Sequence, residues 1–300
     1  MIDLYAEIRR RYGDVRRARG YYLYTEKNIR LLDLWLDGGQ SILGRKAGQA
    51  NLMCKQFFDR GLTGFLPTKA DRQLERAVSA LIPDRPIIRW YESAEKAERI
   101  VRAALKKDTE EQLPVWRPFL GLDYAEFQRT DRGSTDTGVE RTAEEALEPP
   151  LFLVTPAYPA PCGIIAASSG WETAVPPSDP LFPPLVYGLA RAFFDVRRIM
   201  QKEDRDKKDN EKKRLHTASK KDHAAVCRQA EQLVSVIWHK KSRYLFPHIP
   251  TDSYRELFFR ALDARILISP YYDTPSVFPE TESAGELLHF LKTYIMEVSK

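Results

Sequence analysis

Residues 20–44 read GYYLYTEKNIRLLDLWLDGGQSILG, and this stretch does most to define the fold. Two β-prone runs, 21–24 and 29–35, flank a polar turn, which predicts a β-hairpin with a longer loop. A glycine-rich loop follows at 37–39. Upstream, residues 2–18 place apolar side chains at helical spacing among arginines, which predicts a short amphipathic helix.

A second informative stretch, residues 86–97, reads PIIRWYESAEKA. The apolar run 86–91 is typical of a buried strand, and Ser93 is a suitable N-cap for a helix over 94–107. A helix N-terminus presents unpaired N–H groups and a partial positive charge. A strand-to-helix turn of this kind can therefore hold a phosphate monoester.

The rest of the chain alternates between helical and strand patterns, which favours an α/β fold. Helices are predicted over 49–60, 70–82, 181–200, 223–238, 252–263 and 284–298, and strands over 151–154, 163–167 and 265–269. The block 197–222 holds eleven basic and six acidic residues and no aromatic residue. We interpret it as an exposed helix rather than a nucleic-acid surface, because no ring is present on which a base could stack.

The composition is that of a globular protein: 43% apolar residues over 300 residues and a net charge of +5. This surplus is too small to imply nucleic acid by itself. The charged first twenty residues do not predict a secretory signal, and no stretch approaches the roughly 20 apolar residues that span a bilayer. We therefore expect a soluble protein with no membrane partner.

Cysteine and histidine spacing predicts neither disulfides nor a metal site. Cys54, Cys162 and Cys227 are odd in number and far apart, which fits a reducing cytoplasm. On a single helix, His216, His223 and Cys227 would share one face, but no fourth ligand is nearby. We interpret that arrangement as chance.

Two of these segments resemble the class III aminotransferases, a family of fold-type-I enzymes that depend on pyridoxal phosphate. Residues 20–39 are similar to the N-terminal hairpin of that family, and 41–44 to the G-x-x-x-L-G stretch after it. Residues 89–97 lie where the family has a strand and then Ser-Gly-x-Glu-Ala at the start of a helix. A weaker similarity to the same family extends over residues 151–298.

In that family the strand-to-helix turn holds the phosphate of the cofactor. The resemblance therefore implies that Ser93, Ala94, Glu95 and Lys96 bind pyridoxal phosphate. Ala94 stands where the family has the glycine that lets the backbone approach the phosphate closely. The alanine is therefore expected to weaken phosphate binding at this turn. Lys96 is either a phosphate partner or a surface residue of the helix, and the second interpretation is favoured.

The resemblance also implies an α/β fold with two domains. The large domain resembles that of the fold-type-I pyridoxal-phosphate-dependent transferases in a reduced form, and the small α+β domain is assembled from both chain ends. The large domain is expected over 45–200 and the small one over 1–44 and 223–300. The polar stretch 121–149 predicts a mobile connector, and 201–222 a charged helical insertion.

Chemistry in the family needs a lysine that forms a Schiff base with the cofactor and an aspartate beside its ring nitrogen. Neither motif, D-E-V-Q-x-G-x-G-R nor S-K-x-x-x-G-G, occurs here. We therefore expect a degenerate relative, a pseudoenzyme that has lost the cofactor, has no catalytic residues and keeps a binding or structural role. A homodimer is implied, with the loop Gly61–Thr68 near the partner.

Two alternatives stay open. The first is an active pyridoxal-phosphate-dependent aminotransferase with a displaced catalytic lysine. The second is a phosphate or nucleic-acid binding module that uses the charged block 197–222, and it is the least favoured.

Overall fold

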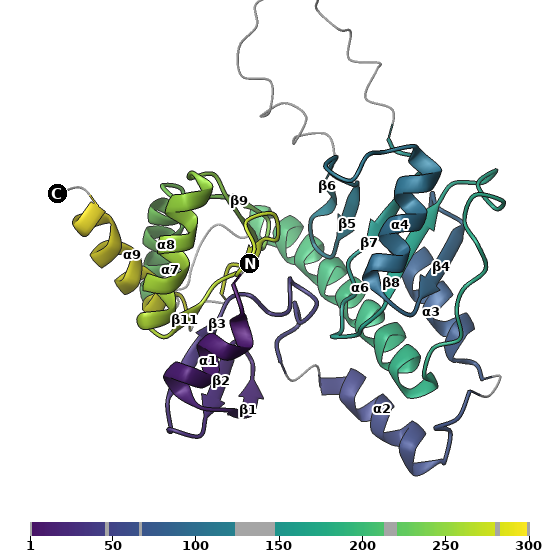
Figure 1. Cartoon of the computed structure of the whole chain (residues 1–300), viewed down its shortest axis with the longest axis horizontal. Coiled ribbons are helices and arrows are strands. Elements are labelled where there is room, and N and C mark those ends of the chain that lie inside the picture. The colour runs from purple at the N-terminus through teal and green to yellow at the C-terminus, as the bar shows by residue number, and fades with distance from the viewer. Residues whose placement is uncertain are drawn as a thin grey trace, which may run out of the picture. The chain divides into compact units, whose positions relative to one another are not determined.

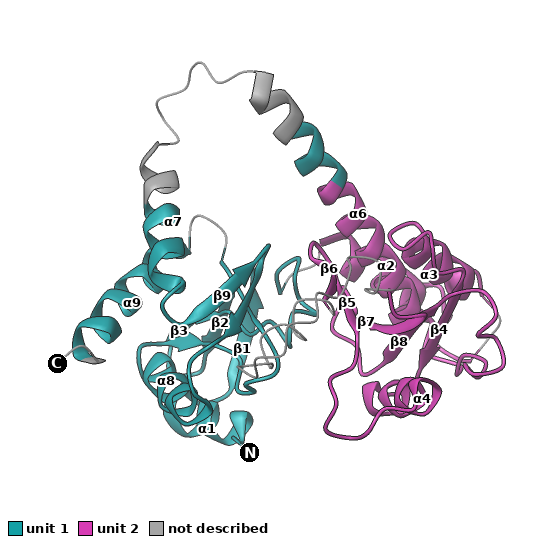
Figure 2. Cartoon of the chain, turned by 90° about the horizontal axis from the view of Figure 1, so that it is seen from above, with its two compact units in different colours: residues 1–47, 201–300 teal, residues 48–200 magenta. Residues whose placement is uncertain are grey.

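The structure is a computed structural model that describes residues 2–45, 48–65, 68–123, 148–212, 221–279 and 283–298. The chain divides into two compact units, shown in different colours in Figure 2. Unit 1 contains residues 1–47 and 201–300, and unit 2 contains residues 48–200.

Unit 1 contains a sheet in the order β1-β2-β3-β11 (Figure 1). The strands are β1 (Val15–Arg19), β2 (Tyr22–Thr25), β3 (Arg30–Asp33) and β11 (Ile266–Leu267). Strands β2 and β3 are antiparallel, which confirms the predicted hairpin. Strand β11 comes from the other end of the chain and lies parallel to β3.

The helix predicted over 2–18 is too long. Helix α1 spans Leu4–Tyr12 and ends at Gly13, whose φ of 76° does not continue a helix. Residues Val15–Arg19 instead form β1, which pairs with β2. One arginine of β1 contacts β2 across this pairing, since the guanidinium of Arg17 lies 4.7 Å from the ring centre of Tyr24. Cross-strand contact of this kind overrides the helical pattern.

The C-terminal part of unit 1 adds helices and a small sheet. The sheet has the order β12-β10-β9 and contains β9 (Trp238–Lys241), β10 (Tyr244–Pro247) and β12 (Ser276–Val277). The helices are α7 (Lys221–Val234), α8 (Thr251–Asp263) and α9 (Ala284–Val298). The helix predicted over 223–238 is therefore wrong at its end, because the fully buried Trp238 begins a strand.

Unit 2 is built on a five-stranded sheet in the order β4-β8-β7-β5-β6. Its strands are β4 (Ile87–Tyr91), β5 (Val115–Arg117), β6 (Gly121–Asp123), β7 (Leu151–Val154) and β8 (Gly163–Ala167). Only β5 and β7 are parallel. Eight residues join β7 to β8, fewer than the dozen or so that a parallel crossover needs, so these two strands are antiparallel.

The helices of unit 2 are α2 (Gly48–Asp59), α3 (Ala70–Ser79), α4 (Ala94–Leu105) and the first part of α6 (Pro183–Lys212). Helix α2 packs against α6, where the ring centroids of Phe57 and Tyr187 lie 4.5 Å apart. Figure 2 shows α4 on one face of the sheet and α3 and α6 towards the other. Helix α4 buries Ala97 and Val101 in a core with Ile165 and Leu151. This packing fixes the N-terminus of α4 beside β4.

Parts of two predicted segments lie outside the described residues. Residues 124–147 take up most of the predicted connector, whose first residues form β6 instead. Residues 213–220, which include His216, belong to the predicted insertion. In the described part of the chain, no helix combines the length and the apolar character that crossing a bilayer requires.

Candidate functional site

The turn between β4 and α4 is held by its own side chains. Ser93 is extended, with φ of −146°, and its Oγ accepts a hydrogen bond from Lys96 N at 3.2 Å. This confirms Ser93 as the N-cap. Hydrogen bonds from the backbone N–H of Glu95 itself and from the Ser93 hydroxyl lower the pKa of the Glu95 carboxyl. Two N–H groups of the first turn of α4 are therefore already engaged.

A carboxylate from a distant segment lies at the same turn. Asp179 Oδ2 accepts a hydrogen bond from Glu92 N at 3.0 Å and lies 2.8 Å from Lys96 Nζ. Lys96 Nζ also lies 3.3 Å from Glu92 Oε1. The hydrogen bond from Lys96 lowers the pKa of Asp179, and the same bond raises the pKa of Lys96.

Backbone pairing brings Asp179 to this position. The N–H of Asp179 donates to Trp90 O at 2.9 Å, and Trp90 N donates to Ser178 Oγ at 3.2 Å. Strand β4 is at the edge of its sheet, with β8 on its other side. The segment before α6 therefore covers the open edge of β4 and carries a carboxylate to the start of α4.

Gly163 allows α4 to approach the sheet closely at this end. A Cβ atom at this position would lie 2.3 Å from Ala97 Cβ and 2.8 Å from Ser93 O. Neither distance is tolerable, because both neighbours are fixed by the helix backbone. The turn is thus closed against β8 by direct backbone contact.

A cavity of about 340 Å³ lies beside the turn. Its lining residues come from the loop before α3, from α3, from β4, and from the segment before α6 with the first residue of that helix: Phe65, Asp71, Trp90, Ser178, Asp179, Pro180, Leu181 and Pro183. Partial burial raises the pKa of the Asp71 carboxyl. The ionisable groups that line the cavity are both carboxylates, and no lysine is among its lining residues in the described part of the chain.

The sequence from 48 to 200 contains five lysines. Lys55, Lys69 and Lys106 are exposed. Lys107 Nζ lies 3.2 Å from Glu111 Oε2, and Lys96 is paired as described. A lysine that attacks an aldehyde needs a lowered pKa, which burial or a neighbouring cation provides. Lys96 has the opposite environment, since its carboxylate partners raise its pKa.

The structure brings Ser93, Glu95 and Lys96 together at the turn, and Ala94 contributes only the first helical position. Sequence reasoning missed the contact with Asp179, which is 83 residues from Lys96 in the chain. No local signal reports such a pairing. His216, one of the three residues weighed as metal ligands, lies outside the described residues. Among the residues that the structure describes, no group of three His, Cys, Asp or Glu side chains is placed to hold a metal ion.

Comparison with known sequences finds two relatives. An uncharacterized protein of Treponema pallidum (strain Nichols) is 35% identical over 315 residues, which covers 95% of each chain. An uncharacterized protein of Borreliella burgdorferi is 41% identical over 54 residues, or 18% of this chain and 20% of that protein. No family model matches the chain.

Comparison with solved structures finds aminotransferases. Ornithine aminotransferase of Toxoplasma gondii ME49 has a TM-score of 0.58 at 10% identity, covering 98% of this chain and 96% of that one. Acetylornithine aminotransferase of Elizabethkingia anophelis has a TM-score of 0.56 at 11% identity, with 98% of each chain covered. An omega-transaminase of Sphaerobacter thermophilus has a TM-score of 0.56 at 11% identity, covering 99% and 97%. At these identities the likeness concerns the fold.

Proposed function

The chain belongs to one family with the Treponema pallidum protein and has the fold of the class III, fold-type-I aminotransferases, and from this premise we propose that it is a non-catalytic relative. In this proposal the protein no longer carries pyridoxal phosphate and serves as a binding or structural component. The single observation that carries the proposal is the ion pair between Lys96 and Asp179 at the start of α4.

The pairing opposes a bound phosphate at this turn. A phosphate would need the N–H groups of the turn and a nearby cation. Here Ser93 and Glu95 engage two of these N–H groups, and Asp179 accepts from Glu92 N while neutralising Lys96. The carboxylates that line the adjacent cavity would repel a second anion. These residues do not fit the cofactor that the resemblance implies.

The lysines support the same proposal. An anchoring lysine has to reach the cavity beside the turn and be present as the free amine. Lys96 is the lysine nearest to the turn in sequence, and its ammonium form is stabilised by two carboxylates. We therefore propose that unit 2 has no group able to hold the cofactor covalently.

The proposal is tested by adding pyridoxal phosphate to the purified full chain, removing the excess by dialysis and recording absorbance between 300 and 500 nm. We expect no retained band near 400 nm. Borohydride treatment before dialysis, followed by peptide mass mapping, is then expected to give only scattered labelling below one group per chain. Stoichiometric labelling of one lysine would contradict the proposal and support an active enzyme with a displaced lysine.

We also propose that the protein forms a homodimer through α2 and the loop after it. Exposed apolar side chains support this: Phe65 is 74% exposed, Phe58 53% and Leu52 44%. Exposed apolar side chains concentrated in one segment of the chain are the kind of surface that an interface covers. Light scattering of wild type and Phe65→Ser tests the idea, with Met296→Gln as control because Met296 is 63% exposed in unit 1. A monomeric wild type would refute it.

A cytoplasmic location is part of the proposal. It rests on the three cysteines, which are free in the structure, as expected of a chain kept in a reducing compartment. Fractionation of the source cells with an antibody against the chain tests this location.

A further inference from the structure

Unit 1 contains a cavity of its own, of about 320 Å³. It lies between α1, the β1-β2 hairpin and the loop after β3. Leu4, Ile8, Leu23 and Leu267 give it an apolar floor, and each of them is more than nine-tenths buried. The volume is within the range of small-molecule sites, which begins at about 300 Å³.

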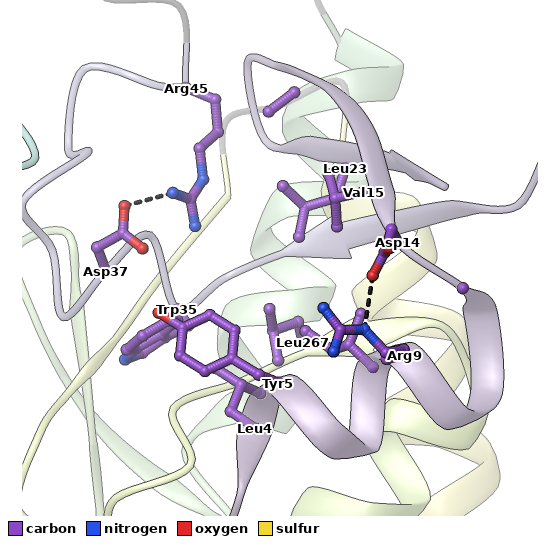
Figure 3. A pocket seen from close by; sticks show the side chains of 13 residues that line it. Leu4, Tyr5, Arg9, Asp14, Val15, Leu23, Trp35, Asp37, Arg45 and Leu267 are labelled. Carbon is purple, nitrogen blue, oxygen red and sulfur yellow. Dashed lines mark hydrogen bonds and ion pairs between the residues drawn. The ribbon is translucent and has the colours of Figure 1, made fainter. Parts of the chain in front are cut away.

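Aromatic rings and an ion pair complete the lining. Figure 3 shows the rings of Tyr5 and Trp35 and the paired side chains of Asp37 and Arg45 around the cavity. Tyr5 is 78% exposed, so its ring is free to close over a ligand from the solvent side. Rings of this kind favour cations over anions at their faces.

An unusual backbone presents Asp37 to the cavity. Leu36, Asp37, Gly38 and Gly39 have φ values of 47°, 55°, 68° and 87°, which make one left-handed turn. Gly39 N donates to Trp35 O at 3.2 Å to close it. This conformation is costly for residues that carry a Cβ atom, and such cost is typical of functional segments.

Arg45 is shared between two carboxylates, that of Asp37 in the lining and that of Asp33, which does not line the cavity. Asp33 is fully buried and accepts hydrogen bonds from Leu36 N at 2.9 Å and Arg45 Nε at 2.7 Å. Asp37 Oδ2 accepts from Arg45 and from Ser41 Oγ. Most of the contacts of the Arg45 guanidinium are to Asp33, and Asp37 Oδ1 accepts no hydrogen bond from the described residues.

The other ionic groups that line the cavity are balanced. Arg9 Nε lies 2.7 Å from Asp14 Oδ1, and both side chains are mainly exposed. The four charged residues that line the cavity therefore sum to zero, and the groups it offers to a ligand are an unused carboxylate oxygen, apolar walls and two aromatic rings. An anion at this oxygen would be repelled by the Asp37 carboxylate, and a ligand without a hydrogen-bond donor would leave the oxygen unsatisfied.

We propose that this cavity binds a small primary amine, with its ammonium group at Asp37 and its apolar or aromatic body against Tyr5 and Trp35. The site is formed by residues of unit 1 alone. The inference does not depend on whether unit 2 has lost its cofactor.

Three probes with the same apolar body and different head groups test the proposal: 2-phenylethylamine, 3-phenylpropionate and 2-phenylethanol. Binding to the full chain is measured by isothermal titration calorimetry and by tryptophan fluorescence. We expect saturable binding of the amine, at least tenfold tighter than that of either other probe. Equal affinity for all three, tighter binding of the carboxylate, or no binding of the amine would overturn the proposal.

Variants locate the site. Asp37→Asn is expected to weaken amine binding at least tenfold and to leave binding of 2-phenylethanol unchanged. Because Asp37 also holds Arg45, the exposed Tyr5→Ala provides a second variant that does not disturb the core, with an expected loss of threefold or more for the amine. Asp14→Asn, in the balanced pair, serves as the matched control. Unchanged amine affinity in both Asp37→Asn and Tyr5→Ala would overturn the proposal.

Discussion

Lys96 Nζ lies 2.8 Å from Asp179 Oδ2, so the chain neutralises its own cation at the start of α4. In a fold of this kind, the N-terminus of a helix after a buried strand is suited to anions. Here the anion is a carboxylate carried by the segment before α6. The helix dipole and the lysine then contribute to folding rather than to binding of a ligand.

Removing this carboxylate should restore the anion site. Asp179→Ala frees Glu92 N and leaves Lys96 Nζ with the exposed Glu92 carboxylate as its remaining partner. We expect inorganic phosphate and pyridoxal phosphate to bind at least tenfold more tightly than to wild type. Calorimetry measures the affinities. The double variant Asp179→Ala with Lys96→Gln should lose the gain, because the cation is then absent. Unchanged affinity in the single variant would show that the turn has no latent anion site.

The pH dependence of stability provides a second check on the pair. Lys96 lowers the pKa of Asp179 below its usual value of about 3.9. The stabilisation from the pair should therefore be complete above that value and disappear as the pH falls through the lower pKa of the folded state. Urea unfolding of wild type and Asp179→Asn at pH 7 and pH 2.5 should show a difference at pH 7 that shrinks in acid. A difference that grows in acid would contradict this assignment.

The sequence predicts the local parts of this site and not the assembly. Ser93 is recognisable as an N-cap because its hydroxyl precedes a helical pattern, and its bond to Lys96 N needs only neighbouring residues. Asp179 is brought in by backbone bonds to Trp90, across 89 positions of sequence. Pairing over such a distance depends on which strand edge is left open, and a single sequence does not encode that locally.

The errors in the fold have a similar cause. Strand β1 has a polar, arginine-rich sequence, and it is a strand only because its partner β2 supplies the hydrogen bonds and the ring of Tyr24. Trp238 continues the helical spacing of α7 but is buried in a sheet with β10. In both cases tertiary contacts decide the conformation over local propensity.

The buried pair between Asp33 and Arg45 should matter for stability. Arg45→Met removes the cation beside a carboxylate that is fully buried, and an uncompensated buried charge costs about 3–5 kcal/mol. Urea unfolding measures the loss. Adding Asp33→Asn to this variant should recover part of it, because the unpaired charge is then gone.

Arg9→Met is the matched control for that experiment. Its partner Asp14 is exposed, as is Arg9 itself, and exposed pairs contribute little to stability. A loss in Arg45→Met no larger than in Arg9→Met would show that Asp33 is protonated or reached by water in the folded protein.

The close approach of α4 to β8 requires a glycine at position 163, because any Cβ atom there would collide with the helix. In Gly163→Ala the new methyl group would lie 2.3 Å from Ala97 Cβ, and the helix has to move away from the sheet. Overpacking of this kind costs about 1–3 kcal/mol. Gly48→Ala, at the start of α2 in the same unit, has no heavy atom within 4 Å of the added Cβ and should be neutral or slightly stabilising. If urea unfolding shows the two variants to be equally stable, then α4 is not held at the distance from β8 that closes the turn.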